Sequence, residues 1–126
     1  MLRLLATASA VILLAAAPAL AQDAKKGENI FKRCAACHNA TTDKNKIGPT
    51  LKGVVGRKAG SIEGFKYSKA MQQKAEEGLV WTKENLDAYL ENPKKVVPRG
   101  SMSFAGLRKA DERTDVITYL ESVASK

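Results

Sequence analysis

The pentapeptide CAACH, residues 34–38, constrains this chain more than any other stretch of its sequence. It contains both cysteines and the single histidine of the 126-residue chain. No disulfide framework can therefore stabilise another region. Two thiols and an imidazole at this spacing are compatible with three kinds of site. These are a redox-active dithiol, a zinc site, and the covalent attachment of haem.

Residues 1–21 have the pattern of a cleaved secretory signal peptide. One cation, Arg3, precedes an apolar run, and the small residues Ala19 and Ala21 predict cleavage after Ala21. The apolar run is shorter than the roughly 20 residues that a comfortable membrane span requires. We therefore expect residues 22–126 to form a single soluble domain that is exported to the periplasm.

The formal net charge of +8 comes mostly from lysines that are spread along the chain. Such an excess of positive charge is typical of proteins with an acidic partner, whether nucleic acid, anionic lipid or an acidic protein face, and also of charge that only maintains solubility. Nucleic acid is not expected as that partner, because the chain is exported and has no recognisable nucleic-acid-binding motif. An acidic face on another protein agrees with both the charge and the location.

Hydrophobic periodicity and capping residues predict an all-α domain of about four short helices separated by long loops. The first expected helix is capped by Asp23 and runs through Cys34, and the second runs from Tyr67 to about Glu77. The third runs from Lys83 to Glu91 after the N-cap Thr82, and the fourth begins near Lys109. Glycine and proline mark residues 39–65 and 93–106 as loops. Long loops with little apolar helix surface suggest a domain that wraps a large apolar cofactor.

The zinc and dithiol interpretations fit the sequence poorly. A structural zinc site usually takes four Cys or His ligands, and this chain has three such residues, all within five positions. A catalytic dithiol sits at the start of a helix in a βαβ pattern, where the helix dipole lowers a thiol pKa. Here the cysteines come at the end of a predicted helix, and no such pattern is visible.

Covalent attachment of haem accounts for all three residues of the motif. Cys34 and Cys37 lie three positions apart on one helical face, so each thiol can add to one vinyl group of the porphyrin. His38 then falls beneath the iron as an axial ligand. The predicted export agrees with this chemistry, because c-type haem is attached outside the cytoplasm. We therefore favour haem over the other two interpretations.

The second axial ligand must be a residue other than histidine, because His38 is the only one in the chain. Methionine is the obvious candidate, and the expected mature chain contains Met71 and Met102. Met71 lies in a predicted helix and suits core packing, whereas Met102 follows a Pro- and Gly-containing loop that can approach a porphyrin. Met102 is the favoured ligand. An open sixth position would instead indicate a haem enzyme with peroxidase-like activity, or a gas sensor.

The chain resembles class I cytochrome c, the small soluble kind found in mitochondria and bacterial periplasms, over nearly all of its expected mature length. The resemblance is carried by CAACH, GPTLKGVVGRKAG, GFKYS, VWTKENLDAYLENPKK and the run from Pro98 through MSFAG. It implies the cytochrome c fold around one covalent haem c. It also implies a one-electron carrier that cycles between Fe(II) and Fe(III) and is not an enzyme.

The resemblance also implies roles for individual residues. Cys34 and Cys37 would hold the haem, and His38 and Met102 would be its axial ligands. The carbonyl of Pro49 would accept a hydrogen bond from His38. Three residues would donate hydrogen bonds to a buried propionate: Arg57, Tyr67 and Trp81. Tyr89 would lie beside the methionine sulfur, and Phe104 would shield the haem edge.

A helix crossing and two departures from the family pattern follow from the same comparison. Gly27 and Phe31 should meet the last helix at Val116, Tyr119 and Leu120. The departing positions are Arg99-Gly100-Ser101, where close relatives have Gly-Thr-Lys, and Met71, where relatives often have asparagine. The family also suggests that Lys94 or Lys95 can replace Met102 on the iron at high pH.

A ring of cations around an exposed haem edge should steer a monomeric carrier onto acidic faces of its partners. The candidates for this ring are Lys32, Arg33, Lys46, Lys94, Lys95 and Arg99. By resemblance, the electron donor and acceptor are a quinol–cytochrome c oxidoreductase and a terminal oxidase, or a photosynthetic reaction centre.

Overall fold

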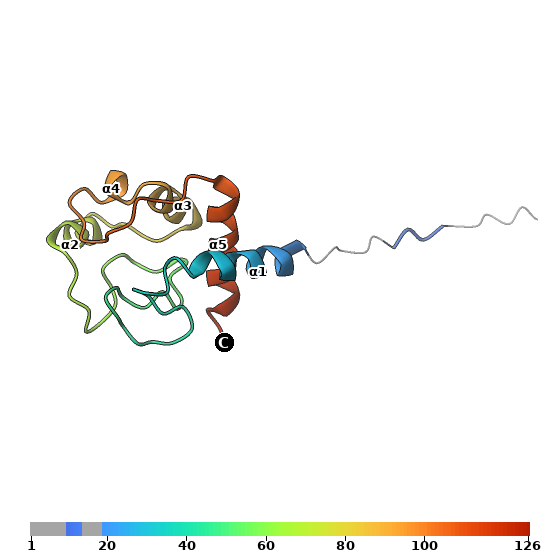
Figure 1. Cartoon of the computed structure of the whole chain (residues 1–126), viewed down its shortest axis with the longest axis horizontal. Helices are drawn as coiled ribbons and strands as arrows, with labels where there is room; N and C mark the ends of the chain where they lie inside the picture. Colours follow the sequence, from blue (N-terminus) through green and yellow to red (C-terminus); the bar gives the residue numbers. More distant parts are fainter. Residues whose placement is uncertain (1–9, 14–18) are drawn as a thin grey trace, which may run out of the picture.

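The computed structural model describes residues 10–13 and 19–126 (Figure 1). Within these residues the chain forms five helices and no strand, with one isolated antiparallel bridge between Lys58 and Val80. The helices are α1 (Ala19–Phe31), α2 (Lys69–Glu76), α3 (Lys83–Glu91), α4 (Pro93–Val96) and α5 (Ala110–Val123). The all-α prediction is confirmed. The predicted signal peptide lies largely outside the described residues and stays a prediction.

Helices α1 and α5 cross to form the scaffold of the domain (Figure 1). At the crossing, a methyl group added to Gly27 would overlap the backbone carbonyl of Asp115 and lie 2.7 Å from Cβ of Tyr119. The rings of Phe31 and Tyr119 pack beside this point with their centroids 5.6 Å apart. The predicted meeting of the two helices is therefore present, and the absence of a side chain at Gly27 permits it.

The buried face of α5 supplies much of the core. Val116, Ile117, Leu120 and Val123 are all buried, as their helical spacing predicts. The guanidinium of Arg113 is also buried and connects α5 to α3 through a 2.7 Å contact between its Nε and Oδ1 of Asp87. Its Nη1 donates to the carbonyl oxygens of Leu107 and Arg108, which fixes the segment that enters α5.

Hydroxyl caps determine where the two middle helices begin. The Ser68 side chain accepts a hydrogen bond from the backbone N–H of Met71, and Thr82 accepts one from Asn85. The predicted range of α3 is confirmed. Helix α2 begins two residues later than expected, because Ser68 rather than an earlier residue forms its cap.

Three sequence-based expectations were wrong. Asp23 lies inside α1 and does not cap it, because the helix-favouring residues from Ala19 onward extend the helix toward the N-terminus. The same helix ends at Phe31, and Cys34 lies in the turns that follow. Residues 93–96, expected in a loop, form the single turn α4, since the fixed φ of Pro93 suits the first position of a helix.

The irregular segment 39–65 and the helices α2 to α4 occupy opposite sides of the end of α1 in the view of Figure 1. The chain therefore enters the CAACH segment where these two parts of the domain face each other. None of the helices in the described part of the chain is both long and apolar enough to cross a membrane.

Candidate functional site

The CAACH segment forms a compact turn directly after α1. The backbone N–H groups of Cys37 and His38 both donate to the carbonyl of Cys34, at 3.1 and 3.0 Å. Burial raises the pKa of the Cys34 thiol, although the neighbouring Arg33 cation acts in the opposite direction. A redox dithiol requires a lowered thiol pKa. This environment therefore disfavours the dithiol interpretation.

The zinc interpretation gains no support from the fold either. Zinc sites in proteins gather several Cys, His, Asp or Glu side chains around one point. Across residues 10–13 and 19–126, no group of three or more such side chains is arranged to hold a metal ion.

His38 is held in one orientation by residues of the loop that follows it. Its Nδ1 lies 2.7 Å from the carbonyl oxygen of Pro49, so a proton on Nδ1 is donated to that oxygen and Nε2 keeps its lone pair. Burial lowers the pKa of His38, which keeps the ring neutral near pH 7. The backbone of Gly48 lies so close to the ring that an added Cβ would be 2.7 Å from Nδ1. His38 is thus prepared to coordinate a metal through Nε2.

Met102 lies beside Tyr89 in the loop after α4. The Tyr89 hydroxyl donates a hydrogen bond to the Met102 sulfur at 3.8 Å, and the Tyr89 ring packs on Trp81 with centroids 4.8 Å apart. Burial raises the pKa of Tyr89 to about 12, so its proton stays in place as a donor. Lys94 lines a small hollow together with Tyr89 and Met102. Met71 packs instead against the core from α2.

The loop before Met102 has a strained residue at its tip. Arg99 adopts a left-handed conformation with φ of 63°, a region that favours glycine. The following Gly100 does not adopt positive φ, and its N–H donates to the carbonyl of Val97 at 3.0 Å. Arg99 therefore combines a backbone conformation that favours glycine with the side chain of an arginine.

Arg57 provides a half-buried cation with unused hydrogen-bonding capacity. Its two terminal nitrogens donate to the carbonyl oxygens of Lys52 at 3.2 Å and Thr50 at 2.9 Å. Its Nε is the one buried side-chain polar atom without a partner in the described part of the chain. Burial lowers the pKa of Arg57, with Tyr67 acting in the opposite direction. An anion placed here would satisfy both the donor and the charge.

Two further donors accompany Arg57. The Tyr67 hydroxyl accepts a hydrogen bond from the backbone N–H of Ile62 at 3.1 Å, which leaves its own proton to donate. Trp81 is buried, and its backbone N–H donates to the carbonyl of Arg57 at 2.8 Å, so the two residues lie side by side. This set of donors fits a carboxylate such as a haem propionate.

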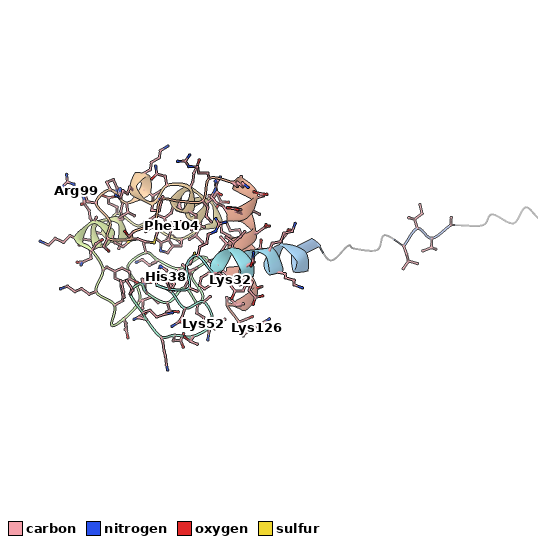
Figure 2. All side chains as sticks on the ribbon, in the orientation of Figure 1. Lys32, His38, Lys52, Arg99, Phe104 and Lys126 are labelled. Atoms are coloured by element: carbon pink, nitrogen blue, oxygen red, sulfur yellow. The ribbon has the colours of Figure 1, made fainter. Side chains whose placement is uncertain are left out.

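The structure brings the predicted site residues together in three groups, around His38, around Met102 and around Arg57. No hydrogen bond among the described residues joins His38 to Met102. Figure 2 shows His38 and Phe104 on different segments of the domain, and Phe104 is half-buried against the core. Sequence reasoning did not identify Gly48, because a glycine before proline resembles any turn until the His38 ring is seen against it.

The six predicted edge cations are all exposed. Two of them have local partners, because Arg33 pairs with Glu112 at 3.3 Å and Lys46 donates to the carbonyl of Ala35 at 2.6 Å. Within the described residues, Lys94, Lys95 and Arg99 take part in no salt bridge. Lys94 and Lys95 lie in α4, and Arg99 lies in the loop between α4 and Met102.

The model of the Cytochrome c family matches residues 24–124. The chain belongs to the cytochrome c family. It is 50% identical over 107 residues to "Cytochrome c 2.1" of Caenorhabditis elegans, covering 84% of this chain and 94% of that protein. It is 52% identical over 101 residues to "Cytochrome c" of Gibberella zeae, covering 79% of this chain and 92% of that protein.

A solved structure agrees with these relatives. Cytochrome cH from Methylobacterium extorquens matches with a TM-score of 0.73 and 44% identity, over 79% of this chain and 98% of that one. The predicted cytochrome c fold and the predicted single covalent haem c are confirmed. This cytochrome c is accordingly an electron-transfer protein.

Proposed function

We propose that this cytochrome c is a periplasmic one-electron carrier whose axial ligands are His38 and Met102 and whose haem is attached at Cys34 and Cys37. The observation that carries the proposal is the 2.7 Å contact between His38 Nδ1 and the Pro49 carbonyl. It fixes the tautomer in which Nε2 can bind iron. When bound, haem supplies reversible one-electron chemistry between Fe(II) and Fe(III).

The surrounding residues favour electron transfer in which no bond to a substrate forms or breaks. With His38 and Met102 in both axial positions, no substrate reaches the metal, so we do not expect enzymatic activity. The Tyr89 hydroxyl orients the Met102 sulfur through its hydrogen bond. Phe104, which is partly buried against the core, would cover the apolar edge of a bound haem.

Arg57, Tyr67 and Trp81 hold a haem propionate in this proposal. The unpartnered Nε of Arg57 supports that role, because a buried guanidinium nitrogen is costly to leave without an acceptor. A carboxylate at this point would complete the hydrogen bonds of Arg57 and neutralise its charge.

Docking onto acidic proteins depends on the exposed cations. Lys94, Lys95 and Arg99 precede Met102 in the chain, Lys32 and Arg33 directly precede CAACH, and Lys46 follows it. Positive charge at these two places would steer an acidic partner toward the site. The proposed donor and acceptor are a quinol–cytochrome c oxidoreductase and a terminal oxidase, or a photosynthetic reaction centre, with the carrier acting as a monomer.

The decisive test uses the mature protein made together with the c-type maturation machinery. We expect a reversible one-electron redox titration, no titratable thiol after denaturation, and no fast binding of carbon monoxide to the reduced protein. Rapid binding of carbon monoxide would indicate an open-site haem enzyme or gas sensor. Two free thiols without haem would support the interpretation of CAACH as a redox-active dithiol. Mass spectrometry of the exported protein tests cleavage after Ala21.

A further inference from the structure

We infer that Asn45 is a positioning residue that acts on His38 through the peptide bond between Pro49 and Thr50. This inference rests on the proposed assignment of His38 as an axial ligand. The carbonyl of that peptide accepts the hydrogen bond from His38 Nδ1 at 2.7 Å. The N–H of the same peptide donates to Oδ1 of Asn45 at 2.9 Å. One peptide unit thus connects the Asn45 side chain to the imidazole.

The orientation of the Asn45 amide follows from the chemistry of its partner. The backbone N–H of Thr50 can only donate, so the atom of Asn45 that faces it must be the oxygen. The two hydrogen bonds then run in series, from His38 to the Pro49 carbonyl and from Thr50 to Asn45.

The peptide that joins the two hydrogen bonds cannot easily rotate. Thr50 is 2% exposed, and its hydroxyl donates to the carbonyl of Thr42 and accepts from the N–H of Lys52. Its carbonyl also accepts from Arg57 at 2.9 Å. These contacts fix Thr50 and with it the peptide bond to Pro49, which makes that peptide a rigid connection between Asn45 and His38.

Hydrogen bonds in series polarise one another. Donation by the Thr50 N–H to Asn45 leaves more negative charge on the Pro49 carbonyl oxygen, which then accepts more strongly from His38 Nδ1. A stronger acceptor makes the imidazole a better electron donor at Nε2. A better donor favours the ferric form, so Asn45 should lower the reduction potential of the carrier.

The test compares Asn45→Ala with Asn39→Ala in the haem-loaded protein. Asn39 is the matched control, because its Nδ2 ties the same loop by donating to the carbonyl of Lys44 at 2.7 Å, away from the Pro49–Thr50 peptide. We expect Asn45→Ala to raise the midpoint potential and to speed hydrogen exchange of His38 Nδ1–H about tenfold, as the loss of one hydrogen bond predicts. Asn39→Ala should change neither quantity.

An unchanged potential in Asn45→Ala, or equal shifts in both variants, would overturn the inference. If Asn45→Ala does not fold, Asn45→Asp decides, because it keeps the acceptor and strengthens it. For that variant the readout is exchange of His38 Nδ1–H, which should slow; unchanged or faster exchange would overturn the inference. Failure of the proposed function is distinguishable, since the unmodified protein would then lack the spectrum of His–Met ligation.

Discussion

The hydroxyl group of Tyr89 donates a hydrogen bond to the sulfur of Met102 across 3.8 Å. This bond withdraws electron density from the sulfur, so the sulfur would be a weaker donor to ferric iron in the proposed ligation by Met102. Tyr89→Phe should therefore lower the reduction potential, by tens of millivolts if the bond contributes about 1 kcal/mol. Spectroelectrochemical titration measures the shift. Tyr119→Phe, at the crossing of α1 and α5, is the control, and an equal shift there would contradict this role of Tyr89.

The raised pKa of Tyr89, about 12, makes stability depend on pH in a defined window. The folded protein keeps this proton above the ordinary tyrosine pKa of about 10, so the unfolded state binds fewer protons between about pH 10 and 12. The contribution of Tyr89 to the free energy of unfolding is thus complete below this window and is lost as pH rises through it. We expect a loss of about 2–3 kcal/mol.

Tyr89→Phe isolates this contribution, because the variant removes the Tyr89 hydroxyl and leaves every other ionisable group in place. The difference in free energy of unfolding between the two, from denaturant titrations at pH 9 and pH 12, should shrink by that amount. Parallel stability curves across the window would show that the Tyr89 hydroxyl does not titrate differently in the folded state.

Gly27 is the residue at which added volume should be most harmful to the scaffold. A methyl group there would overlap the carbonyl of Asp115, which belongs to the backbone and cannot move away alone. Replacing glycine by alanine normally stabilises a helix by about 1 kcal/mol. Forced separation of α1 and α5 outweighs this gain, so Gly27→Ala should cost about 2–3 kcal/mol net. Denaturant unfolding measures it, with exposed Lys25→Ala as a control expected within about 0.5 kcal/mol.

Local sequence signals predicted the elements that local chemistry determines. Thr82 caps α3 because its hydroxyl needs only the N–H of Asn85 three residues later, and the apolar spacing in α5 directly describes its buried face. CAACH identified the covalent haem for the same reason. Each of these signals lies within a few residues of the feature that it predicts.

The expectations that were wrong or missing concern competition and long-range contact. Asp23 is a good cap in isolation, but the residues before it are also good helix formers and extend α1 past it. Pro93 reads as the end of one helix and equally as the start of another. The contact of Asn45 with Thr50 could not be predicted, because it depends on the loop folding back on itself.

The cations near Met102 should accelerate reaction with anionic redox partners. Arg99 and Lys126 lie on opposite sides of the domain in Figure 2, so Lys126 provides a control for charge alone. Lys94→Gln should slow reduction by a multiply charged anionic iron complex about twofold at low salt, and the difference should vanish at high salt. Lys126→Gln should have a smaller effect in stopped-flow experiments. Rates that do not respond to salt would contradict steering by these cations.

Ligation of the iron by Met102 is the central claim, and the far-red absorption spectrum of the oxidised protein tests it most directly. A methionine sulfur bound to ferric haem gives a weak charge-transfer band in this region. We predict that the band is present in the unmodified protein, is lost in Met102→Ala and remains in Met71→Ala. A band that survives in Met102→Ala, or that is absent from the unmodified protein, would contradict the assignment of Met102 as the axial ligand.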